Sequence, residues 1–227
     1  MKGLQAFIIL SLLVSCNPDK KVCEFTSDNE ELVIYNNILT DLIENRMHGR
    51  YLGGKEEEIR EKYCCGKEEV DTARIDVEFV KTHNDIFDNP SMFCTLYLDT
   101  LTRPQFFYDS VRFEQDFEFK TLILEYTNNP RAAVDSLNAL QQRYSPDDFG
   151  LCTSRINRIK NWKNDSTCSF GRLRLSKLVL NDTKDKGLLF YDWHCGSLGL
   201  CGHSGIIEFT KGTKKWKIAD FQYWSVY

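Results

Sequence analysis

The fold class of this chain is decided by four runs of strand-forming residues near its C-terminus. They are Arg172-Leu173-Arg174-Leu175, Gly187 to His194 (GLLFYDWH), Gly205 to Thr210 (GIIEFT) and Lys215 to Phe221 (KWKIADF). The first run alternates in polarity, the others are rich in apolar and aromatic residues, and turn-forming segments separate them. The pattern predicts a four-stranded antiparallel meander over about residues 170–227, with one face buried.

The part of the chain before residue 150 shows mainly helical patterns. Residues 28–48 begin at Ser27-Asp28-Asn29-Glu30, which has the form of a capping box, and continue with apolar residues at helical spacing. Weaker signals predict helices over 55–63 and 67–83, and the clear start signal Asn129-Pro130 predicts a helix that runs to about residue 144. Residues 92–98 predict a strand, and residues 113–126 fit either a helix or a strand.

These patterns together predict an α+β fold in which N-terminal helices pack on a C-terminal sheet. The chain shows no internal repeat and no segment rich enough in Pro, Gly or Ser to act as a linker. We therefore expect one domain over 28–227, with its helical part at about 28–150 and its sheet at about 170–227.

Composition excludes several classes of protein. The 227 residues include 29 Lys and Arg against 33 Asp and Glu, for a net charge of −4, and 42% are hydrophobic. A nucleic-acid binder usually carries an excess of basic residues, so no nucleic-acid partner is expected. The same composition excludes a disordered chain, a collagen and a multi-span membrane protein.

The N-terminus has the form of an export signal. Lys2 precedes an apolar run over residues 4–14 that is too short to span a membrane but suits a signal peptide. Leu13-Val14-Ser15-Cys16 resembles the lipobox of bacterial lipoproteins, in which the cysteine is diacylated and becomes the mature N-terminus. We therefore expect a signal peptide at 1–15, a lipidated tether at 16–27, and a location in the cell envelope, on the outer membrane. The alternative is an ordinary secretory signal with a chance cysteine.

The cysteine count indicates disulfides. Nine cysteines minus the lipidated Cys16 leave eight, and an even number in an exported chain favours pairing. Spacing predicts one bridge between Cys195 and Cys201, across a glycine-rich hairpin loop, and another between Cys152 and Cys168, across a polar loop.

The remaining cysteines include an adjacent pair, Cys64 and Cys65. Ordinary disulfide geometry does not suit neighbouring residues, so these two are not expected to bond to each other. Each is expected to pair with Cys23 or Cys94 or to stay free.

The hairpin loop also offers a zinc site as an alternative to the disulfide. His194, Cys195, Cys201 and His203 are ligand types that tetrahedral zinc prefers. Neighbours on a strand point to opposite faces, however, and an oxidising compartment favours the bridge. We therefore predict the disulfide, with no metal and no cofactor.

The closing segment supports a family resemblance. It contains Trp193-His194-Cys195-Gly196, then Cys201-Gly202, Gly205 to Phe209 and Gly212 to Ile218. This pattern resembles the C-terminal region of uncharacterised bacterial lipoproteins, in which a cysteine-glycine loop precedes a strand and a Lys-Trp-Lys-Ile type final strand follows. The resemblance covers about residues 170–227 and implies no catalytic residue.

No catalytic signature is present, and the chain has only four histidines. We therefore predict a lipid-anchored, non-catalytic binding or interaction module whose sheet and aromatic face meet a protein or a small molecule. The alternative is an envelope hydrolase, or a thiol or zinc enzyme; the raw ingredients of a thiol enzyme are His48, His83, Cys64 and Cys65. A deep cleft converging on histidine, cysteine or carboxylate groups would favour catalysis, and a shallow aromatic groove would favour binding.

Overall fold

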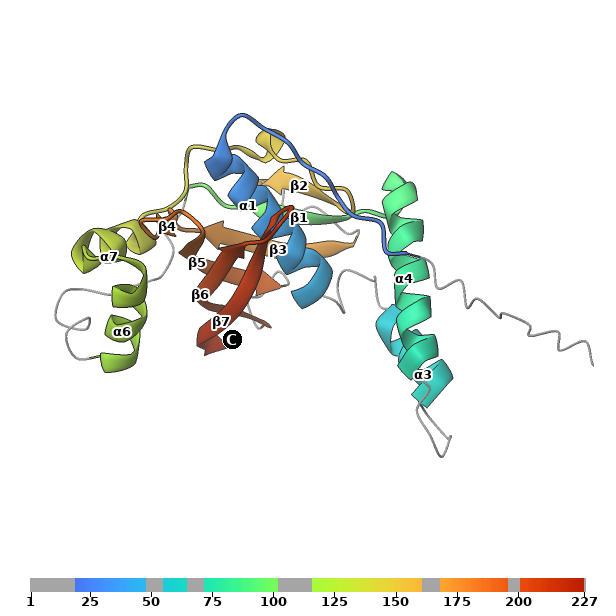
Figure 1. Cartoon of the computed structure of the whole chain (residues 1–227). Coiled ribbons are helices and arrows are strands. Elements are labelled where there is room, and N and C mark those ends of the chain that lie inside the picture. Colours follow the sequence, from blue (N-terminus) through green and yellow to red (C-terminus); the bar gives the residue numbers. More distant parts are fainter. Residues whose placement is uncertain are drawn as a thin grey trace, which may run out of the picture.

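The computed structural model describes residues 19–47, 55–64, 72–101, 116–160, 168–195 and 201–226. These residues form a mixed α+β fold, as predicted, with a central sheet and helices on both of its faces (Figure 1). The longer helices are α1 (Glu30–Asp41), α3 (Lys55–Cys64), α4 (Thr72–Asp88), α6 (Phe117–Tyr126) and α7 (Pro130–Asn138). Shorter turns are the π-helical η1 (Leu42–Arg46) and the 3-10 helices η2 (Pro90–Met92) and η3 (Pro146–Asp148).

Within the described residues the sheet has seven strands. They are β1 (Cys94–Leu98), β2 (Ser154–Arg158), β3 (Ser169–Leu175), β4 (Val179–Leu180), β5 (Lys186–Cys195), β6 (Cys201–Lys211) and β7 (Trp216–Val226). Their order is β2-β1-β3-β5-β6-β7, and β4 also pairs with β5. β1 runs parallel to both β2 and β3, whereas all other pairs are antiparallel.

The predicted four-stranded antiparallel meander is therefore wrong as a description of the sheet. The C-terminal strands β3, β5, β6 and β7 are antiparallel neighbours, but β1 and β2 extend the sheet in parallel. Every residue of β1 is buried, which is typical of a strand covered on both faces. β2 lies in the segment that we predicted to be a disulfide-closed loop, and its sequence Ser-Arg-Ile-Asn-Arg carries little strand signal.

Helix starts follow the capping residues in the sequence. Asn129 caps α7 with Pro130 in the first turn, as predicted. At the start of α1 the capping residue is Asn29, whose side chain accepts from Leu32 N, and not Ser27 of the predicted capping box. Asp116 caps α6, so the ambiguous stretch over 113–126 is helical from Phe117 to Tyr126. The helix α7 ends at Asn138, short of the predicted 144.

The helices predicted over 67–83 and 28–48 differ from the observed ones in their bounds. Residues 67–71 of the helix predicted over 67–83 are not among those described, and α4 continues to Asp88. The long first helix is present as α1 followed by η1.

The early end of α7 coincides with a β-bridge between Leu140 and Ser176, which draws the chain toward the sheet.

Alternation along the strands divides the core between the two faces of the sheet. Leu189 and Tyr191 belong to the cluster that packs under α1, which includes Ile34 and Ile38. The intervening Phe190 belongs to a second cluster, formed with α6 and α7 on the opposite face. The sheet is thus the middle layer of three.

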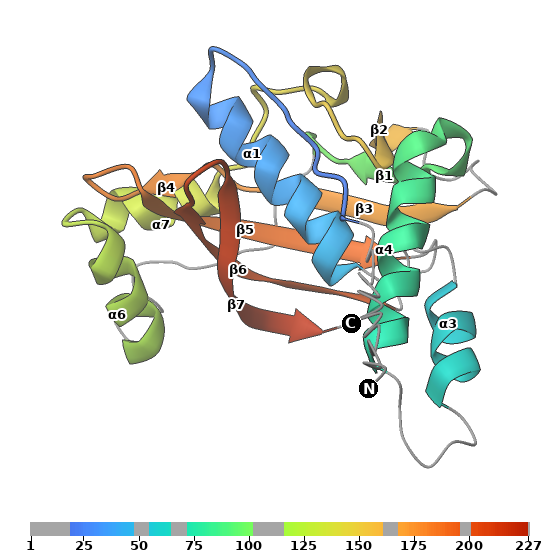
Figure 2. The ribbon, with the colours of Figure 1, turned by 45° about the vertical axis from the view of Figure 1, so that its right-hand side comes forward.

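The helical pairs occupy opposite ends of the molecule. α3 and α4 form a hairpin at one end, with a small core of Ile59, Tyr63 and Ile75, while α6 and α7 lie at the other end (Figures 1 and 2). Among the described residues, no helix has both the length and the apolar character needed to cross a membrane.

Candidate functional site

A chain of buried charges crosses strands β3 and β5 on the face that carries α6 and α7. Arg174 is bonded through Nε to Asp99 Oδ2 at 3.1 Å and through Nη1 to Asp192 Oδ2 at 2.9 Å. All three side chains are 6% exposed or less. Asp192 Oδ1 also lies 2.8 Å from His194 Nε2. We call Asp99, Arg174, Asp192 and His194 the buried ion network.

His194 is the member of this network whose side chain is a candidate for proton transfer. Burial lowers the pKa of its imidazole, while the neighbouring Asp192 carboxylate opposes that effect. The 2.8 Å contact between His194 Nε2 and Asp192 Oδ1 lacks the geometry of a hydrogen bond, so the carboxylate acts on the ring through its charge. Arg174 pairs with both aspartates, and Arg172, which interacts electrostatically with Asp99 and Asp192, supplies a second positive charge, so the network is compensated internally.

A second polar group lies on the other face of the sheet, around His203 on β6. His203 Nδ1 is 2.6 Å from the Tyr191 hydroxyl. The His203 ring also contacts Trp193, with centroids 4.9 Å apart, and Tyr223, at 5.3 Å in an edge-on arrangement. The structure thus surrounds one imidazole with rings from β5 and β7.

The hydrogen bond to Tyr191 sets the proton position on His203. Burial raises the pKa of Tyr191, so its hydroxyl keeps its proton and is able to donate it to His203 Nδ1. Burial also lowers the pKa of His203, which favours the neutral ring. In the tautomer in which the Tyr191 hydroxyl donates, the His203 proton lies on Nε2, and the imidazole offers this Nε2–H to a hydrogen-bond acceptor.

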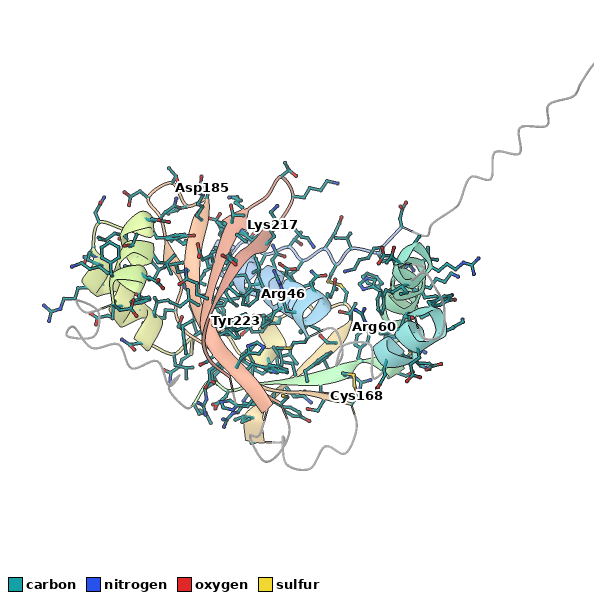
Figure 3. The ribbon with its side chains drawn as sticks, turned by 90° about the horizontal axis from the view of Figure 1, so that it is seen from below. Arg46, Arg60, Cys168, Asp185, Lys217 and Tyr223 are labelled. Carbon is teal, nitrogen blue, oxygen red and sulfur yellow. A yellow bond between two sulfur atoms is a disulfide. The ribbon has the colours of Figure 1, made fainter. Side chains whose placement is uncertain are left out.

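The outer edge of this aromatic group is exposed. Tyr223 is 60% exposed, and its ring stacks at 5.9 Å on Phe221. The guanidinium of Arg46, from η1, lies 4.7 Å from the Phe221 ring centroid. Figure 3 shows Tyr223 on β7, with Arg46 nearby. The residues of this group, called the His203 surface below, are Arg46, Tyr191, Trp193, His203, Phe221 and Tyr223.

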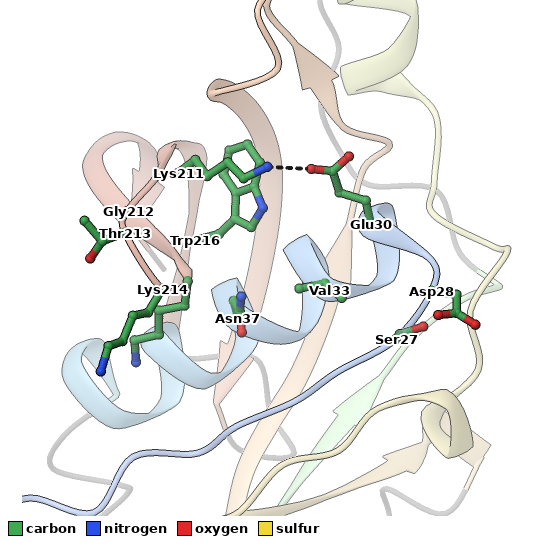
Figure 4. Close-up of a pocket in the computed structure, with 11 residues that line it drawn as sticks. Ser27, Asp28, Glu30, Val33, Asn37, Lys211, Gly212, Thr213, Lys214 and Trp216 are labelled. Carbon is green, nitrogen blue, oxygen red and sulfur yellow. Dashed lines mark hydrogen bonds and ion pairs between the residues drawn. The ribbon is translucent and has the colours of Figure 1, made fainter.

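Two open pockets on the described surface contain none of these groups. One, of about 260 Å³, lies between the start of α1 and the β6–β7 hairpin (Figure 4). Its lining charges have both signs, and Lys211 Nζ bonds to Glu30 Oε1 at 2.9 Å across it. Another, of about 290 Å³, lies at the carboxyl ends of β1 and β2, where Arg143 and Arg158 are each paired with a carboxylate. Neither contains a histidine.

The four residues of the zinc alternative do not share one face of the sheet. His203 lies opposite Trp193 in register and packs with it, whereas His194 contacts Asp192 on the other face. Among the described residues, no group of three or more His, Cys, Asp or Glu side chains could hold a metal ion. This is not the arrangement of a tetrahedral zinc site.

Two disulfides join segments that are distant in sequence. Cys152 bonds to Cys23, with Cα atoms 5.5 Å apart, and Cys168 bonds to Cys94, at 4.6 Å. The predicted Cys152–Cys168 bridge is therefore wrong, although both cysteines are disulfide-bonded. The Cys94–Cys168 bridge follows the fold, because β1 pairs with β3, the strand that Cys168 precedes.

These two disulfides also use the cysteines with which Cys64 and Cys65 were expected to pair. Cys23 and Cys94 are already bonded, so Cys64 and Cys65 pair with neither of them, and the alternative that these two stay free remains a prediction. Cys65 and the side chain of Cys64 lie outside the described residues.

The hairpin disulfide is only partly visible. Cys195 is disulfide-bonded, and Cys201 stands directly opposite it in the β5–β6 register. The Cys201 side chain lies outside the described residues, so the pairing of these two cysteines stays a prediction.

The ingredients of a thiol enzyme are not assembled in the described part of the chain. His83 is buried, and its Nε2 lies 2.9 Å from the backbone oxygen of Lys21. This ring nitrogen is therefore already engaged in a contact with the N-terminal segment. His48 and Cys65 fall outside the described residues.

The buried ion network and the role of Tyr191 were not predicted from the sequence. A signal for the network was present, because Asp192 and His194 stand two residues apart in an otherwise apolar run, and Arg174 lies on a strand expected in the same sheet. Charges on the core side of a strand are rare unless they are paired, so opposite signs on two expected neighbours indicate a contact.

Comparisons of the chain with protein-family models, with curated proteins and with solved structures find no match. The resemblance of the C-terminal segment to bacterial lipoproteins therefore stays a prediction.

Proposed function

We propose that the protein is a lipid-anchored component of the bacterial cell envelope, attached through Cys16 and acting as a binding module. The lipobox-like Leu13-Val14-Ser15-Cys16 supports the anchor. The disulfides Cys23–Cys152 and Cys94–Cys168 support export, because such bonds persist in oxidising compartments.

The observation that carries the binding role is the exposed part of the His203 surface. A 60% exposed Tyr223 ring beside a half-buried histidine combines a flat apolar platform with a hydrogen-bond donor. Arg46 adds a cation at the same edge. Such a surface suits a ligand or partner that offers a ring or another flat apolar group next to an oxygen acceptor.

Site-specific photo-crosslinking tests this role. A photoreactive amino acid at position 223 should capture a partner in intact envelopes. The matched control is position 117, because Phe117 on α6 is also an exposed aromatic, at 80%. A product at 223 that is absent at 117 supports the proposal, whereas no product, or the same product at both sites, contradicts it.

Replacing the lipidated cysteine tests the anchor separately. The Cys16→Ala variant should accumulate as an unprocessed precursor without acyl label, because the modified thiol is gone. Lipid incorporation and normal processing in this variant would contradict the anchor while leaving the crosslinking result unaffected.

An envelope hydrolase is the second candidate, and the contact between Asp192 and His194 is the observation that favours it. In that case His194→Gln should abolish turnover of ester or amide substrates by the purified domain, while Tyr223→Ala should retain it. The binding proposal instead expects no turnover in either variant or in the parent protein.

A further inference from the structure

The first described residues are bound to the surface of α4. We call residues 19–23 the strap. Its Lys21 N donates to Asn84 Oδ1 at 2.9 Å, and Asn84 Nδ2 donates to the Asp19 carbonyl at 3.0 Å. Together with the contact of His83 to the Lys21 carbonyl, these bonds satisfy the strap backbone along one turn of the helix.

Side chains and a covalent bond fasten the strap further. Lys20 Nζ lies 3.2 Å from Glu44 Oε2, and that carboxylate is 7% exposed. Lys21 Nζ pairs with Asp88, near the end of α4. Cys23 then joins the domain through its disulfide to Cys152. The segment predicted as a tether over 16–27 is thus held on the fold from residue 19 onward.

The length of chain left between the strap and the lipid is short. Cys16 precedes Asp19 by three residues, and an extended chain spans at most about 3.5 Å per residue. The reach is therefore about 10 Å. This is little more than the thickness of a headgroup layer, which occupies about 5 to 7 Å of each leaflet.

We propose that the side of the fold formed by the strap and α4 faces the bilayer that holds the acyl chains of Cys16. This inference rests on the proposed anchor. It places α6 and α7, at the far end of the molecule, away from the membrane (Figures 1 and 2).

Chain length rather than charge imposes this orientation. The strap cations Lys20 and Lys21 are each paired with a carboxylate, so they leave little net charge for anionic lipids. Val22, in contrast, is an uncharged side chain of the strap that is 57% exposed, and it faces the membrane interface in this orientation. The contact should therefore form on a zwitterionic surface and resist salt.

Fluorescence quenching in vesicles tests the orientation. The acylated full-length protein is reconstituted in phosphatidylcholine that contains nitroxide-labelled phosphatidylcholine, with a fluorescent amino acid at position 22 or 117. Both native residues are exposed apolar side chains, so neither replacement disturbs the core. Fluorescence should be lost at position 22 and retained at 117. Equal quenching at the two positions would overturn the inference.

Two further arms separate the inference from the anchor. In about 1 M salt, where the Debye length falls to about 3 Å, the quenching at position 22 should persist, and its loss would overturn the argument from chain length. Inserting about 20 Gly and Ser residues after Pro18, with an average span of about 25 Å, should reduce the quenching at position 22.

Vesicle flotation and acyl labelling report on the anchor. A floating, acylated protein with equal quenching at positions 22 and 117 refutes only the orientation, and absence of acylation refutes both the orientation and the anchor.

Discussion

Arg174 and Asp192 face each other in register on β3 and β5 and form a 2.9 Å ion pair in which both side chains are buried. Asp99 completes the arrangement from the end of β1. Charges this deep remain favourable only while each has its partner, because desolvation costs several kcal/mol per ion. These three side chains therefore join β3 and β5 to the end of β1.

Removal of the shared cation should destabilise the fold strongly. Arg174→Ala leaves Asp99 and Asp192 buried without their counter-charge, and we expect a loss of about 3 to 5 kcal/mol in the free energy of unfolding, measured by urea denaturation. Arg158→Ala is the control, because its 3.6 Å pair with Asp147 is exposed and should contribute under about 1 kcal/mol. Similar losses in the two variants would contradict the structural role of the network.

Stability should decrease with acidification because of His203. Burial lowers its pKa in the folded state below the usual value of about 6.5, so below that pH the unfolded chain binds more protons than the native one. The free energy of unfolding should therefore fall as pH drops through about 6.5 and level off once the folded-state pKa is passed.

The variant His203→Phe should show a shallower decrease in the same range, since it keeps a ring but loses the titrating group. Some dependence should remain, because burial also lowers the pKa of His83 and His194. Urea midpoints measured as a function of pH provide the comparison. An unchanged slope in the variant would show that His203 does not titrate differently on folding.

Mass mapping of the non-reduced protein should recover peptides that join Cys23 to Cys152 and Cys94 to Cys168. The bridges span 129 and 74 residues of sequence, so each constrains the unfolded chain considerably. Replacement of Cys94 and Cys168 by serine should cost about 2 to 5 kcal/mol. A peptide joining Cys152 to Cys168 would contradict the fold near β2.

A methyl group at Gly171 should disrupt the sheet. This residue has φ of +94°, and an added Cβ would lie 2.1 Å from the backbone oxygen of His194 on β5. Gly171→Ala should therefore destabilise the protein by about 2 to 4 kcal/mol, through left-handed strain and displacement of a paired strand. Gly212→Ala serves as the milder control, since its nearest contact is 2.9 Å. The midpoints of thermal unfolding compare the two variants. Equal midpoints would contradict the close approach of Gly171 to the backbone of β5.

Local signals in the sequence predicted much of the secondary structure. Asn129-Pro130 starts a helix, and apolar runs such as Gly187 to His194 form strands, because capping and periodicity depend on residues within one or two turns. The α+β class follows from the same short-range patterns. The residue types of the His203 surface were also visible in the aromatic C-terminal run.

Tertiary structure alone decided which elements meet. The parallel addition of β1 and β2, the partners of Cys23 and Cys94, and the pairing of Arg174 with Asp99 all join segments more than 50 residues apart in the chain. Nothing in the local pattern of either segment specifies its partner. Those choices follow from the simultaneous burial of both faces of the sheet, which brings distant strands into register and places polar groups where they must pair.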